Sequence, residues 1–187
     1  MLEELRSHIE KIVRLSDEEF AFVSSHFTIA NFKKNQFIFE KGEKVKHAYY
    51  VVSGLLKLVY IDSSANQHII SFAMEDWWES DFYAYFTQTK ATMSLQCLEK
   101  TTVFCLSLEN YQNLCVRMQK MESFFLQKSN LGFVASQQRI LSLLTSNAKE
   151  RYEQLLDQHP VLFQRVSKTQ LAAYLGVSRE TLSRLHS

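Results

Sequence analysis

The sequence predicts an α+β fold in which an antiparallel β-roll, of the double-stranded β-helix or jelly-roll type, is followed by helices. Three observations predict this fold. Short strand-like runs follow one another between residues 36 and 107, a stretch without proline extends from Glu109 to Thr145, and two capped helical segments flank Gly176. We therefore expect a β-roll, a long helix and a helix-turn-helix domain, in that order along the chain.

Six runs rich in branched and aromatic residues make up the predicted roll. They are QFIFEKG (36–42), AYYVVSG (48–54), LLKLVYI (55–61), QHIISFA (67–73), TMSLQCLE (92–99) and TVFCLS (102–107). Turn-forming residues, including Gly42 and Gly54, separate several of these runs. Regularly spaced short strands are typical of a sandwich or roll and argue against a parallel α/β sheet.

Helices are predicted before the roll. Ser16 is placed to cap a helix and Glu19 to bond back to the cap, which is the pattern of a capping box. Leu15 can pack against Phe20 across the same helix start.

A long helix is predicted after the roll, because residues 109–145 contain no proline and one glycine, Gly132. A helix of about 25 residues or more is too long for the interior of a small domain, so we expect it to span two domains or two subunits. The apolar seam has an imperfect seven-residue spacing, formed by Phe124, Leu131, Val134 and Leu141 and interrupted by Gln127 and Gln138. We favour a dimer helix; the alternative is an amphipathic helix packed on its own roll.

The C-terminal segment predicts a helix-turn-helix. A helix at 148–158 ends before Pro160, the only proline of the chain, and a brief helical stretch at 161–166 follows. Ser167 and Gln170 can form a capping box, Gly176 stands where a tight turn needs a positive φ, and Ser178 can cap a second helix. The predicted inner faces consist of Leu171, Ala172, Leu175, Val177, Leu182 and Leu185.

Composition excludes several classes of protein. Apolar residues make up 46% of the 187 residues, and no apolar run approaches the ~20 residues of a membrane helix. The N-terminus carries frequent charges, so we expect no secretory signal, no membrane association and a cytoplasmic location.

Catalysis and metal binding have no support in the sequence. Cys97, Cys105 and Cys115 are odd in number and widely spaced, which argues against disulfides and a zinc site and favours small buried hydrophobic groups. The six histidines form no pair at metal-ligand spacing, and no nucleophile elbow, phosphate loop or HExxH motif is present. We therefore predict no enzyme, no metal site and no identified cofactor.

Charge is localised at the C-terminal end. The net charge of the chain is +1, yet residues 165–187 contain four cations and one anion: Arg165, Lys168, Arg179, Arg184 and Glu180. A positive end on a nearly neutral body is what one DNA-reading surface would produce.

The second helix of the motif has the chemistry of a base reader. Its outward residues would be Arg179, Glu180, Ser183 and Arg184. Arginine can bond two guanine acceptors, and glutamate can accept a bond from cytosine. Phosphates could be held at the helix starts by Lys168, Thr169, Gln170 and Ser178. The alternative is a structural helical hairpin whose charges serve only solubility.

These residues resemble the Crp/Fnr transcription regulators over nearly the whole chain. FIFEKGE (37–43) and YYVVSG (49–54) are similar to the first strands and glycine turns of that family's roll, and SRETLSR (178–184) is similar to its recognition helix. The resemblance implies Arg179, Glu180 and Arg184 as base readers. Residues 148–185, together with EDWWESDF (75–82), are similar to the branch common in Bacteroidetes.

The resemblance also implies domains and partners. It predicts a cyclic-nucleotide-binding-like regulatory roll with flanking helices at 1–118, a dimerisation helix at 119–146 and a DNA-binding domain at 147–187. Double-stranded DNA, a second copy of the chain and RNA polymerase are the implied partners. A small-molecule effector is left open.

The effector region departs from the family pattern. The family holds cyclic nucleotides with a Gly-Glu step and an arginine, whereas Ser80-Asp81-Phe82 stands here, with only Lys90 near Ala91-Thr92. An uncompensated buried phosphate would be costly, so we expect no cyclic AMP binding. The candidate pocket residues are Trp77, Trp78, Ser80, Asp81, Phe82, Lys90 and Thr92.

The aromatic side chains of the candidate effector region can be interpreted in two ways. Either they fill the pocket as core, which we favour, or they line a site for an apolar ligand; they are Trp77, Trp78, Phe82, Tyr83, Tyr85 and Phe86. The iron–sulfur branch of the family is excluded, because no cysteine precedes Cys97. No haem ligand can be identified.

Only two residues follow the second helix of the motif, so no wing is expected after it. Either this branch ends with that helix or the sequence is shortened. The sequence thus predicts a DNA-binding transcriptional regulator; the alternative is a small-molecule sensor module that signals through protein contacts.

Overall fold

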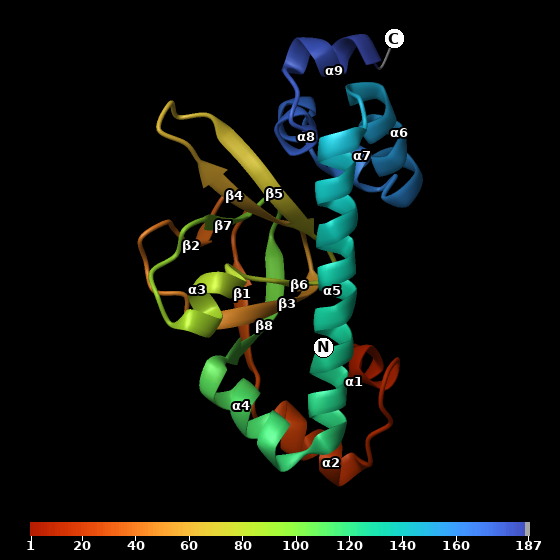
Figure 1. The fold of residues 1–187 in the computed structure, drawn as a ribbon. Helices are drawn as coiled ribbons and strands as arrows, with labels where there is room; N and C mark the ends of the chain where they lie inside the picture. Colours follow the sequence, from red (N-terminus) through yellow and green to blue (C-terminus); the bar gives the residue numbers. More distant parts are fainter. Residues whose placement is uncertain (186–187) are drawn as a thin grey trace. The chain divides into compact units, whose positions relative to one another are not determined.

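The computed structural model describes residues 1–185, which divide into two compact units (Figure 1). The first unit comprises Met1–Tyr60 and Ser71–Ser129, and the second comprises Ile61–Ile70 and the described residues from Asn130 on. His186 and Ser187 lie outside the described residues. The fold class is the predicted one: antiparallel sheets, a long helix and C-terminal helices.

The predicted β-roll lies in the first unit, except for residues 61–70, which include the end of β4 and the first part of β5 and belong to the second unit. Its strands are β1 (Thr28–Phe32), β2 (Phe37–Phe39), β3 (His47–Ser53), β4 (Leu56–Ile61), β5 (Gln67–Ala73), β6 (Trp78–Glu79), β7 (Ser94–Cys97) and β8 (Thr101–Ser107). They form two four-stranded sheets in the orders β1-β8-β3-β6 and β2-β7-β4-β5. All six predicted runs contain a strand, whereas β1 and β6 were not predicted.

One apolar core is shared by the two sheets. Tyr49 and Val103 reach it from one sheet, and Leu58 and Leu95 from the other. The sheets therefore pack face to face, as their alternating inward side chains require. Cys97 and Cys105 belong to this core, where burial raises the pKa of each thiol to about 11. Both thiols are inert apolar groups, as the sequence predicted.

Gly54 forms the tight β3–β4 connection, with φ at +104°. A Cβ atom at this position would lie 2.7 Å from the carbonyl oxygen of Lys100 and would collide with Thr101. No other residue type fits without a shift of backbone.

Helices cover a second core of the first unit. They are α1 (Leu2–Glu10), α2 (Asp17–Ser24), α4 (Leu108–Arg117) and the first turns of α5 (Gln119–Thr145); a short helix, α3 (Phe82–Thr87), follows β6. Leu5, Leu114, Met121 and Phe124 are all fully buried in this cluster. The Ser16–Glu19 capping box at the start of α2 is confirmed.

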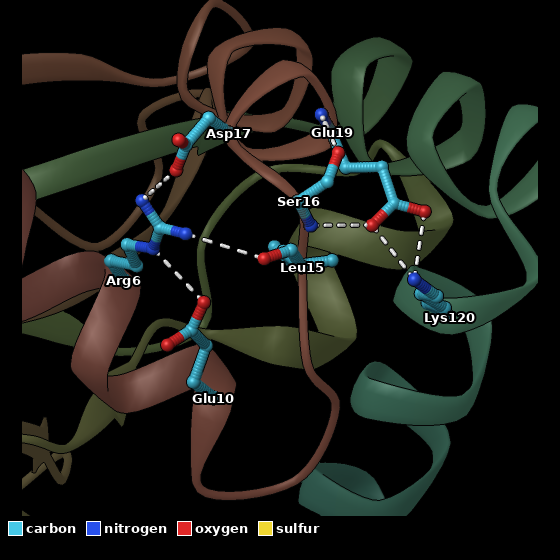
Figure 2. Close-up of polar contacts among 7 residues, drawn as sticks. All are labelled: Arg6, Glu10, Leu15, Ser16, Asp17, Glu19 and Lys120. Carbon is cyan, nitrogen blue, oxygen red and sulfur yellow. Dashed lines mark hydrogen bonds and ion pairs between the residues drawn. The ribbon is translucent and has the colours of Figure 1, made fainter.

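Polar contacts link α1, α2 and α5 at the surface of this cluster (Figure 2). The Arg6 guanidinium donates to Glu10 at 2.9 Å and to Asp17 at 2.7 Å. Glu19 accepts from Lys120 of α5 at 2.7 and 2.8 Å. Exposed ion pairs of this kind stabilise weakly, so packing of the apolar residues provides most of the cohesion.

A buried polar network joins α1 to the roll. His8 shares a hydrogen bond of 2.6 Å between its Nδ1 and Asp76, and its Nε2 accepts from the Trp78 indole at 2.9 Å. Burial is the main cause that lowers the pKa of His8 to about 4. The imidazole is therefore neutral at physiological pH, and Asp76 receives the Nδ1 proton.

The long helix α5 begins at Gln119 and ends at Thr145, close to the expected bounds of 119–146, but the helical run expected from residue 109 is interrupted before it. Residues 109–145 were expected to be helical throughout, yet α4 ends at Arg117 and Met118 has extended dihedral angles, φ −142° and ψ 102°. Helix α5 then runs for 27 residues. The assignment of Phe124 to the exposed seam is wrong, because this ring is fully buried against Phe125 and His8.

The second unit contains the C-terminal helices. They are α6 (Ala148–Gln158), α7 (Leu162–Arg165), α8 (Lys168–Leu175) and α9 (Arg179–Leu185). Tyr152, Leu155 and Leu162 are buried between them.

Candidate nucleic-acid interface and effector region

Helix α8 begins and ends as the sequence predicted. Ser167 accepts from the Gln170 backbone N–H and its own N–H donates to the Gln170 side chain at 3.0 Å, which completes the capping box. Leu171, Ala172 and Leu175 are buried on the inner face. The apolar side of α8 therefore anchors the motif to the rest of the second unit.

The turn between α8 and α9 depends on Gly176. Its φ of +66° and ψ of 38° lie in the left-handed region, where glycine is favoured. Ser178 then accepts from the Thr181 N–H at 3.1 Å and caps α9. Leu182 is 2% exposed and fixes the inner side of α9. The tight bend and both caps are thus present.

The four predicted base readers lie together on the outer side of α9. Arg179, Glu180, Ser183 and Arg184 are all exposed. Hydrogen bonds from the backbone N–H of Glu180 and from Ser178 lower the pKa of the Glu180 carboxyl, and the two arginines add to the effect. The face therefore carries two cations and one acceptor at its surface, which is a set that can bond base edges.

The predicted phosphate-holding residues divide into two kinds. Lys168 and Thr169 are exposed at the first turn of α8. Gln170 and Ser178 are engaged in the two helix caps. Lys168 and Thr169 are accordingly the better candidates for phosphate contacts, while Gln170 and Ser178 position the helices.

Two arginines that sequence reasoning missed hold the C-terminal end of α8. Arg139 of α5 donates to the Tyr174 carbonyl at 2.8 Å and to the Ile69 carbonyl at 3.1 Å, and its guanidinium lies 3.6 Å from the centre of the Tyr174 ring. Arg151 of α6 donates to the Leu175 carbonyl at 3.0 Å. Cations at this end satisfy the last carbonyls and complement the helix dipole. They fix the end of α8 directly before the turn.

The candidate effector residues occur in three different environments. Ser80 and Asp81 are fully buried, whereas Trp78 is partly buried and packs against Phe27 and Phe125 in the second core, under the helices. Trp77 and Phe82 are about 40% exposed, and Lys90 and Thr92 lie at the surface.

The expectation that six aromatic side chains fill a pocket is correct for only two of them. Tyr85 is fully buried and donates to the Leu106 carbonyl, and Trp78 belongs to the core. The other four, Trp77, Phe82, Tyr83 and Phe86, are between 37% and 64% exposed. Trp77 precedes β6 and the other three lie on the outer side of α3, so their positions and not their apolar character leave them exposed.

Three consecutive buried polar residues, Glu79, Ser80 and Asp81, all have hydrogen-bond partners. Glu79 accepts from Ser71 at 2.5 Å and from the Ser80 N–H at 3.0 Å, and Ser80 donates to the His47 carbonyl. Burial raises the pKa of Glu79 to about 7. Asp81 accepts from Thr92 through both the backbone N–H and the hydroxyl, at 2.7 and 2.8 Å.

Within residues 1–185, no group of three or more histidine, cysteine or acidic side chains is arranged to hold a metal ion. In the same part of the chain, no helix is long and apolar enough to cross a membrane.

Comparison with known proteins identifies the roll. The model of the cyclic nucleotide-binding domain family matches residues 29–118. Curated relatives include the transcriptional activator protein Anr of Pseudomonas protegens, 24% identical over 164 residues, and the anaerobic regulatory protein of Haemophilus influenzae, 25% identical over 166 residues. Each match covers 82% of this chain and 66% or 63% of the relative, so the chain spans slightly less than two thirds of their length.

Solved structures agree with this result. A protein of the Crp/Fnr family from Eubacterium rectale is similar with a TM-score of 0.70 and 14% identity, over 91% of this chain and 82% of that one. At this identity the likeness establishes the fold. Residues 29–118 therefore match the cyclic nucleotide-binding domain family, and the chain has the fold of a solved Crp/Fnr-family protein.

Proposed function

We propose that the protein is a sequence-specific DNA-binding transcriptional regulator of the Crp/Fnr type. The observation that carries the proposal is the outer side of α9, where Arg179, Glu180, Ser183 and Arg184 are exposed while Leu182 is buried on the inner side. The printed functions of the two curated relatives, a transcriptional activator and an anaerobic regulatory protein, support it.

Helix α9 would lie in the major groove of DNA. Arg179 and Arg184 would each bond guanine O6 and N7, and Glu180 would accept from the cytosine amino group. Lys168 and Thr169 would hold a phosphate and set the register of the helix. A regulator of this kind works where DNA and RNA polymerase are present, which places it in the cytoplasm.

A homodimer would present two such helices. Beyond the roll, α5 carries many exposed apolar side chains: Leu126, Leu131, Phe133, Val134, Ile140, Leu141, Leu143 and Leu144. A charged or polar face would be expected on a solvated helix, so this surface favours a second copy of α5 as partner. Two-fold symmetry then predicts a palindromic site with half-sites about 34 Å apart.

The roll would be a regulatory domain with a degenerate or altered effector site. Residues 75–92 contain no arginine, and Lys90 is exposed at the surface. Residues 75–92 would offer a cyclic phosphate no buried cation to balance its charge, which argues against cyclic AMP as the effector. Assignment to a Bacteroidetes-type branch remains a prediction from the sequence.

Selection of bound DNA from a random pool tests the proposal directly. We expect an enriched palindrome whose half-sites are one helical turn apart. The double variant Arg179→Ala, Arg184→Ala should lose this selectivity while keeping its circular dichroism spectrum and melting temperature.

The matched control is Lys149→Ala, which removes an exposed cation from α6 in the same unit. It should leave the enriched sequence unchanged. If neither the wild-type chain nor the control enriches any sequence, the roll is a sensor module that signals through protein contacts, and the C-terminal helices serve only as a structural element.

A further inference from the structure

Asp81 has an unusual environment for a carboxylate. It is fully buried, and it follows two other buried polar residues, Glu79 and Ser80. One carboxylate oxygen accepts from the Ala84 N–H at 3.1 Å and so caps α3. A buried carboxylate without bonded partners would cost several kcal/mol, so the other oxygen must also be satisfied.

The second oxygen of Asp81 is held by a cradle of neutral donors before β7. It accepts from the Thr92 N–H at 2.7 Å, the Thr92 hydroxyl at 2.8 Å and the Met93 N–H at 3.2 Å. Converging N–H and O–H groups of this kind form an oxyanion site, because each bond to a charged acceptor is stronger than a bond between neutral groups. We name Thr92 and Met93, with these three donors, the 92–93 cradle.

The cradle is positioned by contacts that do not involve Asp81. The Ala91 carbonyl accepts from the Gly42 N–H at 2.8 Å, and the Ala91 N–H donates to the Glu43 carbonyl at 2.8 Å. On the other side, the Ser94 hydroxyl accepts from the Lys41 N–H at 2.9 Å. The 92–93 cradle is therefore anchored at both ends to the segment 41–43, and its donors would keep their direction without the Asp81 side chain.

We propose that the 92–93 cradle is an oxyanion site whose ligand is a carboxylate supplied by the chain itself, Asp81. The internal anion bonds the start of α3 to the cradle. As long as Asp81 occupies the cradle, the donors are saturated, and the phosphate of a nucleotide finds none of them available. This consequence deepens the proposed function, but the site itself does not depend on DNA binding.

Removal of the side chain should convert the cradle into a site for a free carboxylate. Asp81→Ala loses four hydrogen bonds to a charged acceptor, so its melting temperature should fall by roughly 10 °C. Sodium acetate should restore part of this loss in a saturable manner, and sodium chloride at equal ionic strength should not. The wild-type chain should melt at the same temperature in both salts.

Two variants show whether rescue uses the cradle. Thr92→Val in the Asp81→Ala background removes the hydroxyl donor and should weaken the apparent affinity for acetate about tenfold. Ser107→Ala removes a simple cap, in which Ser107 accepts only from the Asn110 N–H at the start of α4. This variant should also be destabilised, but acetate should not restore it.

The proposal is overturned if acetate shifts the melting of Asp81→Ala no more than that of Ser107→Ala. Should Asp81→Ala not fold in chloride, the yield of refolding in acetate against chloride replaces the melting temperature, and equal yields overturn the proposal. Millimolar cyclic AMP should leave the melting of the wild-type chain unchanged, and a rise would contradict a filled cradle. None of these measurements uses DNA, so their failure is distinct from failure of the proposed function.

Discussion

At the scale of single residues, the roll contains an acid, Glu79, whose pKa is raised by folding. The Glu79 carboxyl is buried with two donors, Ser71 and the Ser80 N–H, and with no cation bonded to it among the described contacts. Burial disfavours the charged form, which raises its pKa from 4.5 to about 7. A buried acid in this state links stability to pH.

The link predicts that the protein is more stable in weak acid than in weak base. Because the folded-state pKa lies above the unfolded value, the stabilising effect is complete below about pH 4.5 and is lost as the pH rises through 7. Between about pH 5 and pH 8 the loss should be roughly 2 to 3 kcal/mol. Denaturant unfolding of the wild-type chain and of Glu79→Gln measures it, because the neutral amide removes this dependence.

His8 has the opposite effect on the pH dependence of stability, and it is present in both the wild-type chain and Glu79→Gln. Its folded-state pKa of about 4 lies below the ordinary 6.5, so its contribution is lost as the pH falls through 6.5 toward 4. Subtracting the pH profile of Glu79→Gln from that of the wild-type chain therefore removes the contribution of His8. Equal pH profiles for the two proteins would mean that Glu79 is ionised in the folded state.

Glycine substitutions separate steric collision from dihedral strain. Gly54→Ala should lower the free energy of unfolding by roughly 3 kcal/mol or more, because the new Cβ meets the Lys100 carbonyl and Thr101 at a positive φ. Gly42→Ala has the same kind of φ but open space, and should cost about 1 to 2 kcal/mol. Gly132→Ala lies in the exposed part of α5 and should stabilise by up to ~1 kcal/mol. Urea unfolding of the three variants checks this order; equal costs at 54 and 42 would contradict the collision.

At the scale of elements, local chemistry predicted most boundaries. The Ser16, Ser167 and Ser178 caps and the Gly176 turn depend on neighbours within a few residues, and each is present. Strand β1 was missed because Thr28–Phe32 is mostly exposed or half-buried and lacks a clear apolar side. Its place in the sheet comes from pairing with β8, 69 to 77 residues away.

Other features could not be predicted from the sequence because contacts between distant residues determine them. Nothing local marks the break at Met118, since no proline or glycine is there; the extended residue lets Met121 and Phe124 enter the second core. The partners of Arg139 lie 70 and 35 residues away. The candidate base readers were predictable because exposed charge on a short capped helix is a local property. The Asp81 contact was not, because it joins α3 to the start of β7.

The exposed apolar side chains of α5, apart from Leu143, form two stripes, of which the sequence analysis identified one. Leu131, Val134 and Leu141 form the predicted stripe, and Leu126, Phe133, Ile140 and Leu144 form a second. At 100° per residue the centres of the two stripes are about 110° apart on the helix. An interface between two copies of α5 would bury only one of these two stripes.

We predict that the stripe with Val134 is the dimer seam. Val134→Glu would place two carboxylates in the seam and should weaken the dimer by about 100-fold or more, and Phe133→Glu, on the other stripe, should leave the dimer intact. Sedimentation equilibrium of both variants measures the effect. The opposite pattern would assign the seam to the second stripe, and two unaffected variants would exclude α5 as the dimer helix.

At the scale of the whole molecule, charge balance sets how DNA binding would depend on salt. The net charge of +1 gives little long-range attraction for DNA, so affinity must come from the few cations near α8 and α9. Non-specific binding should therefore be weak, and the ratio of specific to non-specific affinity should depend on the base readers.

Two single variants should separate the roles of these cations. Lys168→Ala removes one proposed phosphate contact per subunit, so it should weaken specific and non-specific binding alike and reduce the slope of log K against log salt by about 1 per subunit. Arg179→Ala removes a proposed base contact, so it should cost roughly 1 to 3 kcal/mol on the selected site and little on random DNA. Fluorescence anisotropy titrations across a range of salt concentrations give both quantities. If Arg179→Ala changed only the salt slope, and equally for both kinds of DNA, Arg179 would be a phosphate contact, and the selectivity would have to come from Glu180, Ser183 and Arg184.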